Sequence, residues 1–217
     1  MAVKETKAYP ETGWGMPFVY FWDSSVQIVN RAKNGRSTKT FISEGLWKSI
    51  TEEVSEGDYV FIQFGHNDES VDKKERYATP DTFRMNLNRF INDTRNKRAI
   101  PVLFTPVGRR KFDAAGKIMQ THLIYAQLTR EVAIEQKVVL IDLDARSQLL
   151  YQHYGEENSK LLFLHLKSGD HPNYPEGKED NTHFSELGAR LIAQEVLSQI
   201  RIQIPGLESY IVKPKNK

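Results

Sequence analysis

One stretch, residues 57–68, limits the fold more than any other part of the chain. It begins with the turn pair Gly57-Asp58 and continues through Tyr59–Phe64, which is β-branched or aromatic apart from one glutamine. An apolar run of this length between turn residues is typical of a strand buried on both faces, as in a parallel sheet. Small and polar residues follow at Gly65–Asp68, and ligand sites of open α/β sheets lie at the carboxyl ends of their strands. A buried strand followed by an ordinary polar turn fits the same residues, so this stretch alone leaves the function open.

Strand and helix patterns alternate along the rest of the chain. Further strands are expected at 26–30, 100–104 and 138–141, and helices at 41–54, 80–97, 121–136, 142–154 and 185–200. A helix is also expected between 11 and 22, regular only after Pro17, whereas 161–180, rich in His, Gly and Pro, is expected to be a loop. This alternation predicts an α/β fold, a three-layer α/β/α sandwich with helices on both faces of a parallel sheet. No internal repeat or linker is visible, so residues 1–217 are expected to form a single domain.

Composition excludes several classes of protein. The 217 residues are 39% hydrophobic and 27% charged, as is ordinary for a soluble globular protein. The formal charge of +2, with both signs spread along the chain, gives no electrostatic reason to expect a nucleic-acid or membrane partner, and Arg109–Lys111 is expected to be a solvated loop. The sequence has no cysteine, which excludes disulfides, thiolate metal sites and a cysteine nucleophile. No apolar run approaches the roughly 18 residues of a membrane span, and no signal peptide is visible.

An Asp-x-x-His pair, Asp180 and His183, lies just before the last predicted helix. An aspartate at this spacing can accept a hydrogen bond from the imidazole Nδ1–H, which fixes the tautomer and stabilises the imidazolium. Such a histidine is a competent general base for a serine hydroxyl. The same spacing also fits a turn in which Asp180 caps backbone amides and His183 packs on the helix.

A metal site is another interpretation of the polar residues. The candidate ligands are His66, Asp68, His165, His171 and His183. Their spacings match no recognised metal-ligand pattern, so no metal is expected.

Gly35, Asn67 and the Asp180–His183 pair each lie at a predicted strand or helix boundary. A glycine N–H and an asparagine side-chain amide are suitable donors to the oxyanion of an acyl transfer. Their order resembles that of the SGNH (GDSL-type) hydrolases, and the detail resembles the rhamnogalacturonan acetylesterase branch. Five blocks carry the resemblance over nearly the whole chain: Tyr9-Pro-Glu-Thr-Gly-Trp-Gly15, Asn30-Arg-Ala-Lys-Asn-Gly-Arg-Ser37, Gln63-Phe-Gly-His-Asn-Asp68, Thr105-Pro-Val-Gly-Arg109 and Asp180-Asn-Thr-His-Phe184.

The resemblance implies a carbohydrate esterase that removes O-acetyl groups from rhamnogalacturonan-type pectic polysaccharide by a Ser-His-Asp mechanism, without a cofactor. An acetylated oligo- or polysaccharide is the implied partner, while the oligomeric state and the compartment stay open. Carried over residue by residue, it makes His183 the base, Asp180 its orienting partner, and Gly35 and Asn67 the oxyanion donors.

Supporting roles follow from the same resemblance. It implies that Gly65, His66 and Asp68 support the loop that carries Asn67. Trp14, in the first block, is expected to pack in the interior and not to contact sugar.

The family's first block, a strand that ends in Gly-Asp-Ser, has no counterpart in the printed sequence, which begins Met1-Ala2-Val3-Lys4. Met1 resembles the position just after that block, so we expect an N-terminal truncation that removes the first, inner strand of a flavodoxin-like sheet. The chain by itself is then expected to lack the nucleophile and to be inactive. Ser37 does not occupy the family position of the nucleophile, and Ser24, Ser25 and Ser43 have no base nearby in sequence.

Two other functions stay open at the level of sequence. One is a catalytically dead SGNH-like protein that binds acetylated carbohydrate through the remaining site. The other is a flavodoxin-like binder of phosphate or nucleotide, for which Asn34–Ser37 would be only a weak phosphate loop.

Overall fold

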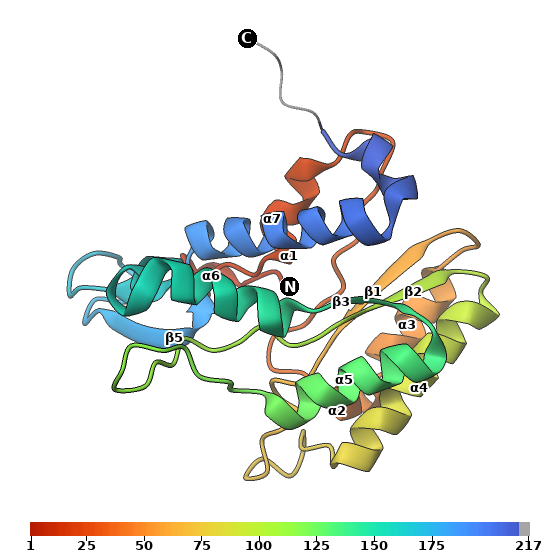
Figure 1. Cartoon of the computed structure of the whole chain (residues 1–217), viewed down its shortest axis with the longest axis horizontal. Coiled ribbons are helices and arrows are strands. Elements are labelled where there is room, and N and C mark those ends of the chain that lie inside the picture. Colours follow the sequence, from red (N-terminus) through yellow and green to blue (C-terminus); the bar gives the residue numbers. More distant parts are fainter. Residues whose placement is uncertain (213–217) are drawn as a thin grey trace. The chain divides into compact units, whose positions relative to one another are not determined.

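The computed structural model describes residues 1–212 (Figure 1). The chain forms two compact units, each made of segments from different parts of the sequence. Unit 1 comprises Met1–Asn34, Arg109–Met119 and the chain from Ser147 onward. Unit 2 comprises Gly35–Gly108 and Gln120–Arg146. None of the helices within residues 1–212 is both long and apolar enough to cross a membrane.

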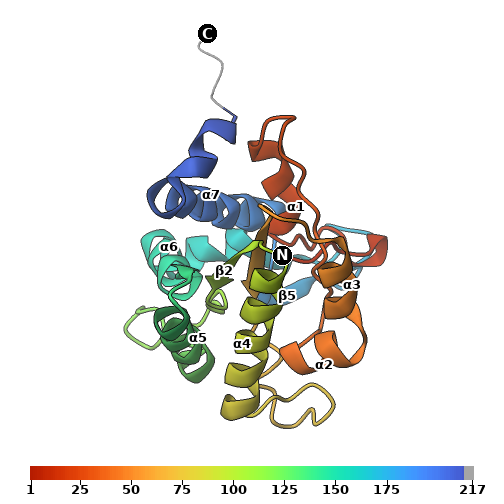
Figure 2. The same ribbon diagram turned by 90° about the vertical axis from the view of Figure 1, so that its right-hand side faces the viewer.

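Unit 2 is built on a parallel sheet of three strands in the order β1-β2-β3. The strands are β1 (Tyr59–Gln63), β2 (Ile100–Phe104) and β3 (Val139–Ile141). Helices α4 (Pro80–Asn96) and α5 (Leu123–Gln136) pack against the sheet and run beside β2 (Figure 2). The predicted α/β class, with a parallel sheet flanked by helices, is therefore confirmed, and these three strands lie where the apolar runs predicted them.

The amphipathic pattern of α4 is realised in the core of unit 2. Thr79 caps the helix, because its side-chain oxygen accepts a hydrogen bond from the Thr82 N–H at 3.2 Å, and Pro80 takes the first helical position. The predicted apolar stripe is at most 1% exposed and consists of Phe83, Leu87, Phe90 and Ile91. Because burial of each such side chain contributes roughly 1.5–3 kcal/mol, this stripe fixes α4 in place.

The single helix predicted at 41–54 is wrong, since the segment forms two helices, α2 (Thr38–Ser43) and α3 (Leu46–Glu53). Gly45, between them, has φ of +74°, a left-handed conformation that interrupts the helical hydrogen bonds. α2 begins with a capping box, in which the side chains of Ser37 and Thr40 each bond the other residue's backbone N–H. The Ser37 hydroxyl is therefore engaged in a helix cap.

Unit 1 contains α1 (Gly15–Phe18), α7 (Glu186–Gln203) and the part of α6 (Leu143–Asn158) that follows Arg146. A regular helix after Pro17 is not formed, because a 3₁₀ turn follows α1 directly. Trp14 is 1% exposed and packs edge-on against Phe18, with 5.4 Å between ring centroids. This position agrees with the interior packing predicted for Trp14.

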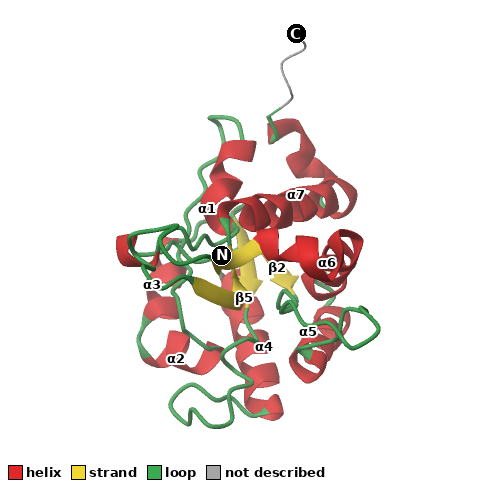
Figure 3. Ribbon diagram, turned by 90° about the vertical axis from the view of Figure 1, so that its left-hand side faces the viewer, coloured by secondary structure: helices red, strands yellow, loops and turns green. Residues whose placement is uncertain are grey.

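The segment 161–180 was expected to be a loop, and that prediction is wrong at its two ends, while 167–177 lies outside the helices and strands. It contains β4 (Phe163–Leu166), which pairs antiparallel with β5 (Lys178–Phe184). The strand β5 is labelled in Figure 3. The glycines and prolines that indicated a loop lie in the connection between the two strands. β5 itself consists largely of polar residues with low strand propensity, so its pairing with β4 makes it a strand. Asp180 and His183 consequently lie on a strand.

The strand predicted at 26–30 is also wrong, because this segment is irregular. A strand needs a neighbour for its backbone hydrogen bonds, and 26–30 pairs with no strand within residues 1–212. Asn30 makes side-chain bonds instead, its Nδ2 donating to the Met1 carbonyl at 2.8 Å and its Oδ1 accepting from the Ala32 N–H at 3.2 Å. These side-chain bonds hold the segment in place without the backbone hydrogen bonds of a strand pair.

Candidate active site

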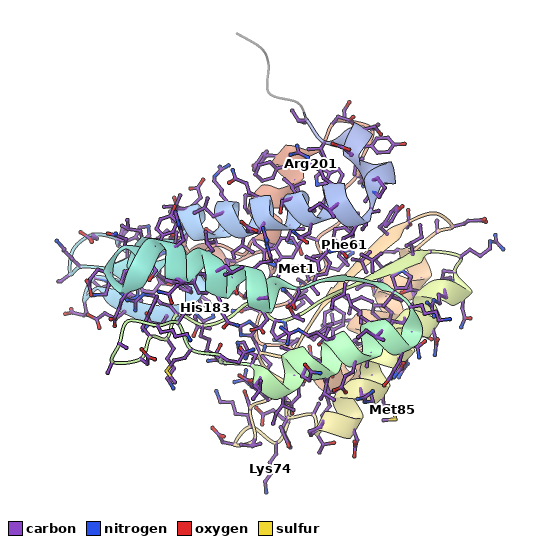
Figure 4. All side chains as sticks on the ribbon, in the orientation of Figure 1. Met1, Phe61, Lys74, Met85, His183 and Arg201 are labelled. Carbon is purple, nitrogen blue, oxygen red and sulfur yellow. The ribbon has the colours of Figure 1, made fainter. Side chains whose placement is uncertain are left out.

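Asp180 and His183 form a carboxylate–imidazole pair on β5 of unit 1. His183 is labelled in Figure 4. Asp180 Oδ2 lies 2.8 Å from His183 Nδ1. The His183 side chain is 39% exposed, whereas that of Asp180 is 15% exposed, so the imidazole reaches solvent and the carboxylate is mostly covered. With Nδ1 held by the carboxylate, Nε2 is the nitrogen that can take a proton from a nucleophile.

The second carboxylate oxygen of Asp180 fixes the backbone around the pair. Asp180 Oδ1 accepts hydrogen bonds from the N–H groups of Thr182 at 2.7 Å and His183 at 2.9 Å. Burial alone would raise the pKa of the Asp180 carboxyl, but the bonds from the His183 ring and from these two N–H groups outweigh burial and hold the pKa well below its ordinary value. Amide capping and imidazole binding, which the sequence offered as alternatives, therefore occur together.

A second carboxylate lies near the other imidazole nitrogen. Glu11 Oε1 is 3.6 Å from His183 Nε2, and Lys4 Nζ forms an ion pair with the same oxygen. The side chains of Lys4 and Glu11 are only 9% and 10% exposed, so each charge is compensated mainly by its partner. Glu11 belongs to the first of the five blocks but received no role from the sequence, and Lys4 was missed.

Arg110 holds β5 in place through hydrogen bonds to Asn181. Its Nη1 donates to Asn181 Oδ1 at 2.9 Å, its Nε donates to Ser159 Oγ at 3.0 Å, and its backbone N–H donates to the Asn181 carbonyl at 2.9 Å. Arg110 is 7% exposed, so the prediction of a solvated loop at Arg109–Lys111 is wrong at this residue. The bonds to Asn181 hold the strand directly beside Asp180.

In unit 2, Asp68 holds the turn that follows β1. It is fully buried, and its Oδ1 accepts from the Thr38 N–H at 2.8 Å and from the Thr38 hydroxyl at 2.5 Å, while its Oδ2 accepts from the Gly65 N–H at 3.1 Å. Burial raises the pKa of the Asp68 carboxyl to about 6, although these neutral donors oppose the shift. Asp68 thus ties the turn after β1 to the start of α2.

Gly35 and Asn67, the predicted oxyanion donors, are linked through shared partners in unit 2. Asn67 Nδ2 donates to the carbonyl of Arg36 at 3.0 Å, and Gly35 has φ of +74°. Arg76 Nη1 donates to Asn67 Oδ1 at 2.9 Å and to the Gly35 carbonyl at 3.5 Å. The sequence indicated the glycine and the asparagine, but nothing in it pointed to Arg76.

His66 lies between Gly65 and Asn67 and packs against a buried histidine. The ring centroids of His66 and His122 are 4.2 Å apart in an edge-on arrangement, and His122 Nδ1 lies 2.9 Å from Glu69 Oε2. The His122 side chain is completely buried. Neither His122 nor Glu69 was singled out by the sequence, because the pair joins segments 53 residues apart.

The predicted site residues fall into two groups. His183 and Asp180 form the first group in unit 1, and the second group, in unit 2, contains Gly35, Gly65, His66, Asn67 and Asp68. Among residues 1–212, no cluster of three or more His, Cys, Asp or Glu is arranged to hold a metal ion.

A parallel sheet flanked by helices and a carboxylate–imidazole pair fit an α/β protein that carries a histidine base for hydrolysis. Residues 15–191 match the model of the GDSL-like Lipase/Acylhydrolase family. The chain belongs to this family. The matched span contains both groups of predicted site residues.

Two curated relatives from Bacillus subtilis (strain 168) are similar over most of the chain. Rhamnogalacturonan acetylesterase RhgT is 41% identical over 208 residues, which cover 96% of this chain and 88% of the relative. Probable rhamnogalacturonan acetylesterase YesY is 35% identical over 201 residues, which cover 92% of this chain and 88% of the relative. The likeness to the acetylesterase branch that the five blocks indicated is therefore confirmed.

A solved structure shares the fold. The crystal structure of the Bacillus subtilis protein YXIM matches with a TM-score of 0.77 and 25% identity, over 92% of this chain and 53% of that chain. This chain therefore spans about half the length of that protein.

Proposed function

We propose that this protein is a carbohydrate acetylesterase that removes O-acetyl groups from rhamnogalacturonan-type pectic polysaccharide. The 2.8 Å contact between Asp180 Oδ2 and His183 Nδ1 carries the proposal, because it is the arrangement that a serine esterase needs for its base. The names of the two Bacillus subtilis relatives support the substrate class. Family membership supports the reaction class, the hydrolysis of a carboxylic ester.

His183 is the proposed general base. Its Nε2 takes the proton of a serine hydroxyl as the serine oxygen bonds to the acetyl carbon, and then returns that proton to the sugar oxygen that leaves. Water next attacks the acetyl-serine with the same base, and acetate is released. The ionised Asp180 stabilises the imidazolium that forms at each of these steps.

The Gly35 N–H and Asn67 Nδ2 are the proposed oxyanion donors. In the tetrahedral intermediate the carbonyl oxygen carries a full negative charge, and donors fixed in advance stabilise this charge without reorganisation. Each such donor typically changes kcat by a factor of about 10²–10³. The rigid turn that Asp68 holds provides the necessary preorganisation for Asn67.

The nucleophile decides how the proposal is tested. The printed sequence contains no Gly-Asp-Ser block, which is where the family resemblance places the serine. We would therefore compare this chain with a form preceded by a strand that ends in Gly-Asp-Ser-Thr. Both would be incubated with acetylated rhamnogalacturonan oligosaccharides and, separately, with a serine-directed fluorophosphonate, followed by intact-mass measurement.

Acetate release and labelling by the extended form alone is the expected result, with loss of at least about 10³-fold in kcat on His183→Ala. Labelling of the printed chain at one of its own serines would contradict the predicted absence of a nucleophile. Binding of the acetylated oligosaccharide by both forms, without acetate release or labelling, would favour the catalytically dead carbohydrate-binding protein. Faster release from acetylated xylan would contradict the proposed substrate class.

A further inference from the structure

We propose that Arg76 is a positioning residue that fixes which end of the Asn67 side-chain amide is presented to the substrate. This inference rests on the proposed function, because it concerns one of the two oxyanion donors named there. It assigns a role to a residue of the charged loop between β1 and α4 that neither the sequence pattern nor the family blocks singled out.

Arg76 contacts both of the residues proposed as oxyanion donors. Its Nη1 donates to Asn67 Oδ1 at 2.9 Å and to the Gly35 carbonyl at 3.5 Å. The bond to Gly35 joins residues 41 positions apart, and the bond to Asn67 joins residues nine positions apart. The same Arg76 nitrogen therefore contacts both of the proposed oxyanion donors.

The chemistry of the two partners makes the contact selective. The two ends of an asparagine amide have nearly the same shape, but only the nitrogen end can donate to an oxyanion. A guanidinium has donors and no acceptor, so it stabilises only the rotamer that turns Oδ1 toward it. With Oδ1 held by Arg76, Nδ2 lies on the other side of the amide, where it donates to the Arg36 carbonyl at 3.0 Å. Nδ2 has a second hydrogen for the substrate.

The positive charge has a second effect. A hydrogen bond from a cationic donor polarises the acceptor amide and makes its N–H groups stronger donors. Loss of Arg76 is therefore expected to weaken transition-state stabilisation more than substrate binding.

The surroundings of Arg76 do not suggest that it serves stability alone. Its Nε is buried and has no hydrogen-bond partner among the described residues. A buried donor without a partner lowers the stability of the folded state, and such local costs concentrate at functional sites. Arg76 Nη1 donates to the oxygens of Asn67 and Gly35, while Arg76 Nε is left without an acceptor among the described residues.

The first test uses NMR and needs no activity. The 217-residue chain is labelled with ¹⁵N. In this protein, Arg76→Gln is expected to shift or broaden the side-chain NH₂ signals of Asn67, because the donor to Asn67 Oδ1 is lost. Lys74→Gln is the matched control, since it removes the same charge from the same loop and the Lys74 side chain points away from the protein (Figure 4). Asn67 signals that are unchanged by Arg76→Gln, or equally changed by both substitutions, would overturn the proposal.

The second test uses kinetics on the form that releases acetate. Arg76→Gln is expected to lower kcat about 10–100-fold with KM changed less than about 3-fold, while Lys74→Gln leaves both near the parent values. In an Asn67→Ala background, Arg76→Gln should lower kcat no further, because Arg76 acts through Asn67. An equal further loss in that background would mean that Arg76 acts independently of Asn67 and would contradict the inference. If the parent form releases no acetate, the proposed function fails, and the NMR result still decides the inference about Arg76.

Discussion

Asp180 in unit 1 and Asp68 in unit 2 are both aspartates at the candidate site, and the fold shifts their pKa values in opposite directions. The carboxyl of Asp180 is held well below its ordinary pKa, whereas burial raises the pKa of Asp68 to about 6. Both accept hydrogen bonds from two backbone N–H groups. They differ in that Asp180 also faces an imidazole and retains some exposure, while Asp68 is fully buried among neutral donors.

This difference shows that hydrogen bonds alone do not decide the charge of a carboxylate. A partner that can carry positive charge favours the ionised form, and complete burial opposes it. Asp180 is accordingly suited to stabilise an imidazolium during a reaction. Asp68 is suited to hold two chain segments together, because a buried acceptor with three donors is costly to remove.

The largest effect is expected for Asp68→Ala. The substitution leaves the Thr38 N–H, the Thr38 hydroxyl and the Gly65 N–H buried without their acceptor, and we expect the free energy of unfolding to fall by about 3 kcal/mol at pH 5. Urea denaturation measures this loss, and Asp68→Asn, which keeps one acceptor, should lose roughly half as much. A loss below about 1 kcal/mol for Asp68→Ala would show that other contacts hold the turn.

A somewhat smaller effect is expected for Gly65→Ala in the same turn. Gly65 has φ of +125°, and an added Cβ would lie 3.0 Å from Pro106 Cγ, so we expect a loss of about 2 kcal/mol. Gly116→Ala in unit 1 is a comparison variant, because Gly116 has φ of +72° and open space around the added Cβ. Thermal unfolding measures both variants, and a loss for Gly65→Ala no larger than that for Gly116→Ala would contradict the strain expected at Gly65.

The pH dependence of stability tests the raised pKa of Asp68. Because the folded-state pKa of about 6 lies above the ordinary value of 3.8, the folded state binds the proton more tightly, and the contribution of Asp68 is fully present below about pH 4 and lost as the pH rises through 6. The unfolding free energy of the parent minus that of Asp68→Asn should therefore fall by on the order of 2 kcal/mol between pH 4 and 7. Urea titrations of both proteins at several pH values measure it, and a difference that stays constant or rises with pH would contradict the assigned shift.

The smallest change in stability is expected for Asp180→Asn, about 1 kcal/mol or less at pH 7. The asparagine oxygen can still cap the Thr182 and His183 N–H groups, and only the contact with the ring is lost. Since the pKa of Asp180 is depressed, its contribution is present above about pH 4 and is lost as the pH falls, which is the opposite direction from Asp68. Denaturation from pH 7 down to pH 3 measures it. An advantage of the parent over Asp180→Asn that grows as the pH falls below about 4 would contradict this sign.

Much of the fold could be predicted from local patterns. The strands of unit 2 were visible as apolar runs, and α4 was visible through Thr79, Pro80 and its apolar stripe, because these signals act over neighbouring residues. The errors at 26–30 and 161–180 arose where pairing partners decide the structure. β5 has a polar sequence and becomes a strand only because β4 lies beside it.

The residues of the candidate site also fall into those that local sequence patterns indicated and those that depend on distant contacts. The sequence alone indicated the pair of Asp180 and His183, because an aspartate three residues before a histidine can accept a hydrogen bond from the imidazole Nδ1–H when the chain between them turns. It also marked Gly35 and Asn67 through their family blocks. The surroundings of these residues became visible only in the folded chain, where they are formed by Lys4, Glu11, Arg76, Arg110 and His122. These side chains contact partners between 7 and 172 residues away, as the ion pair of Glu11 with Lys4 and the 3.6 Å distance from Glu11 Oε1 to His183 Nε2 illustrate. Contacts made by folding over such separations leave no periodic trace in the sequence.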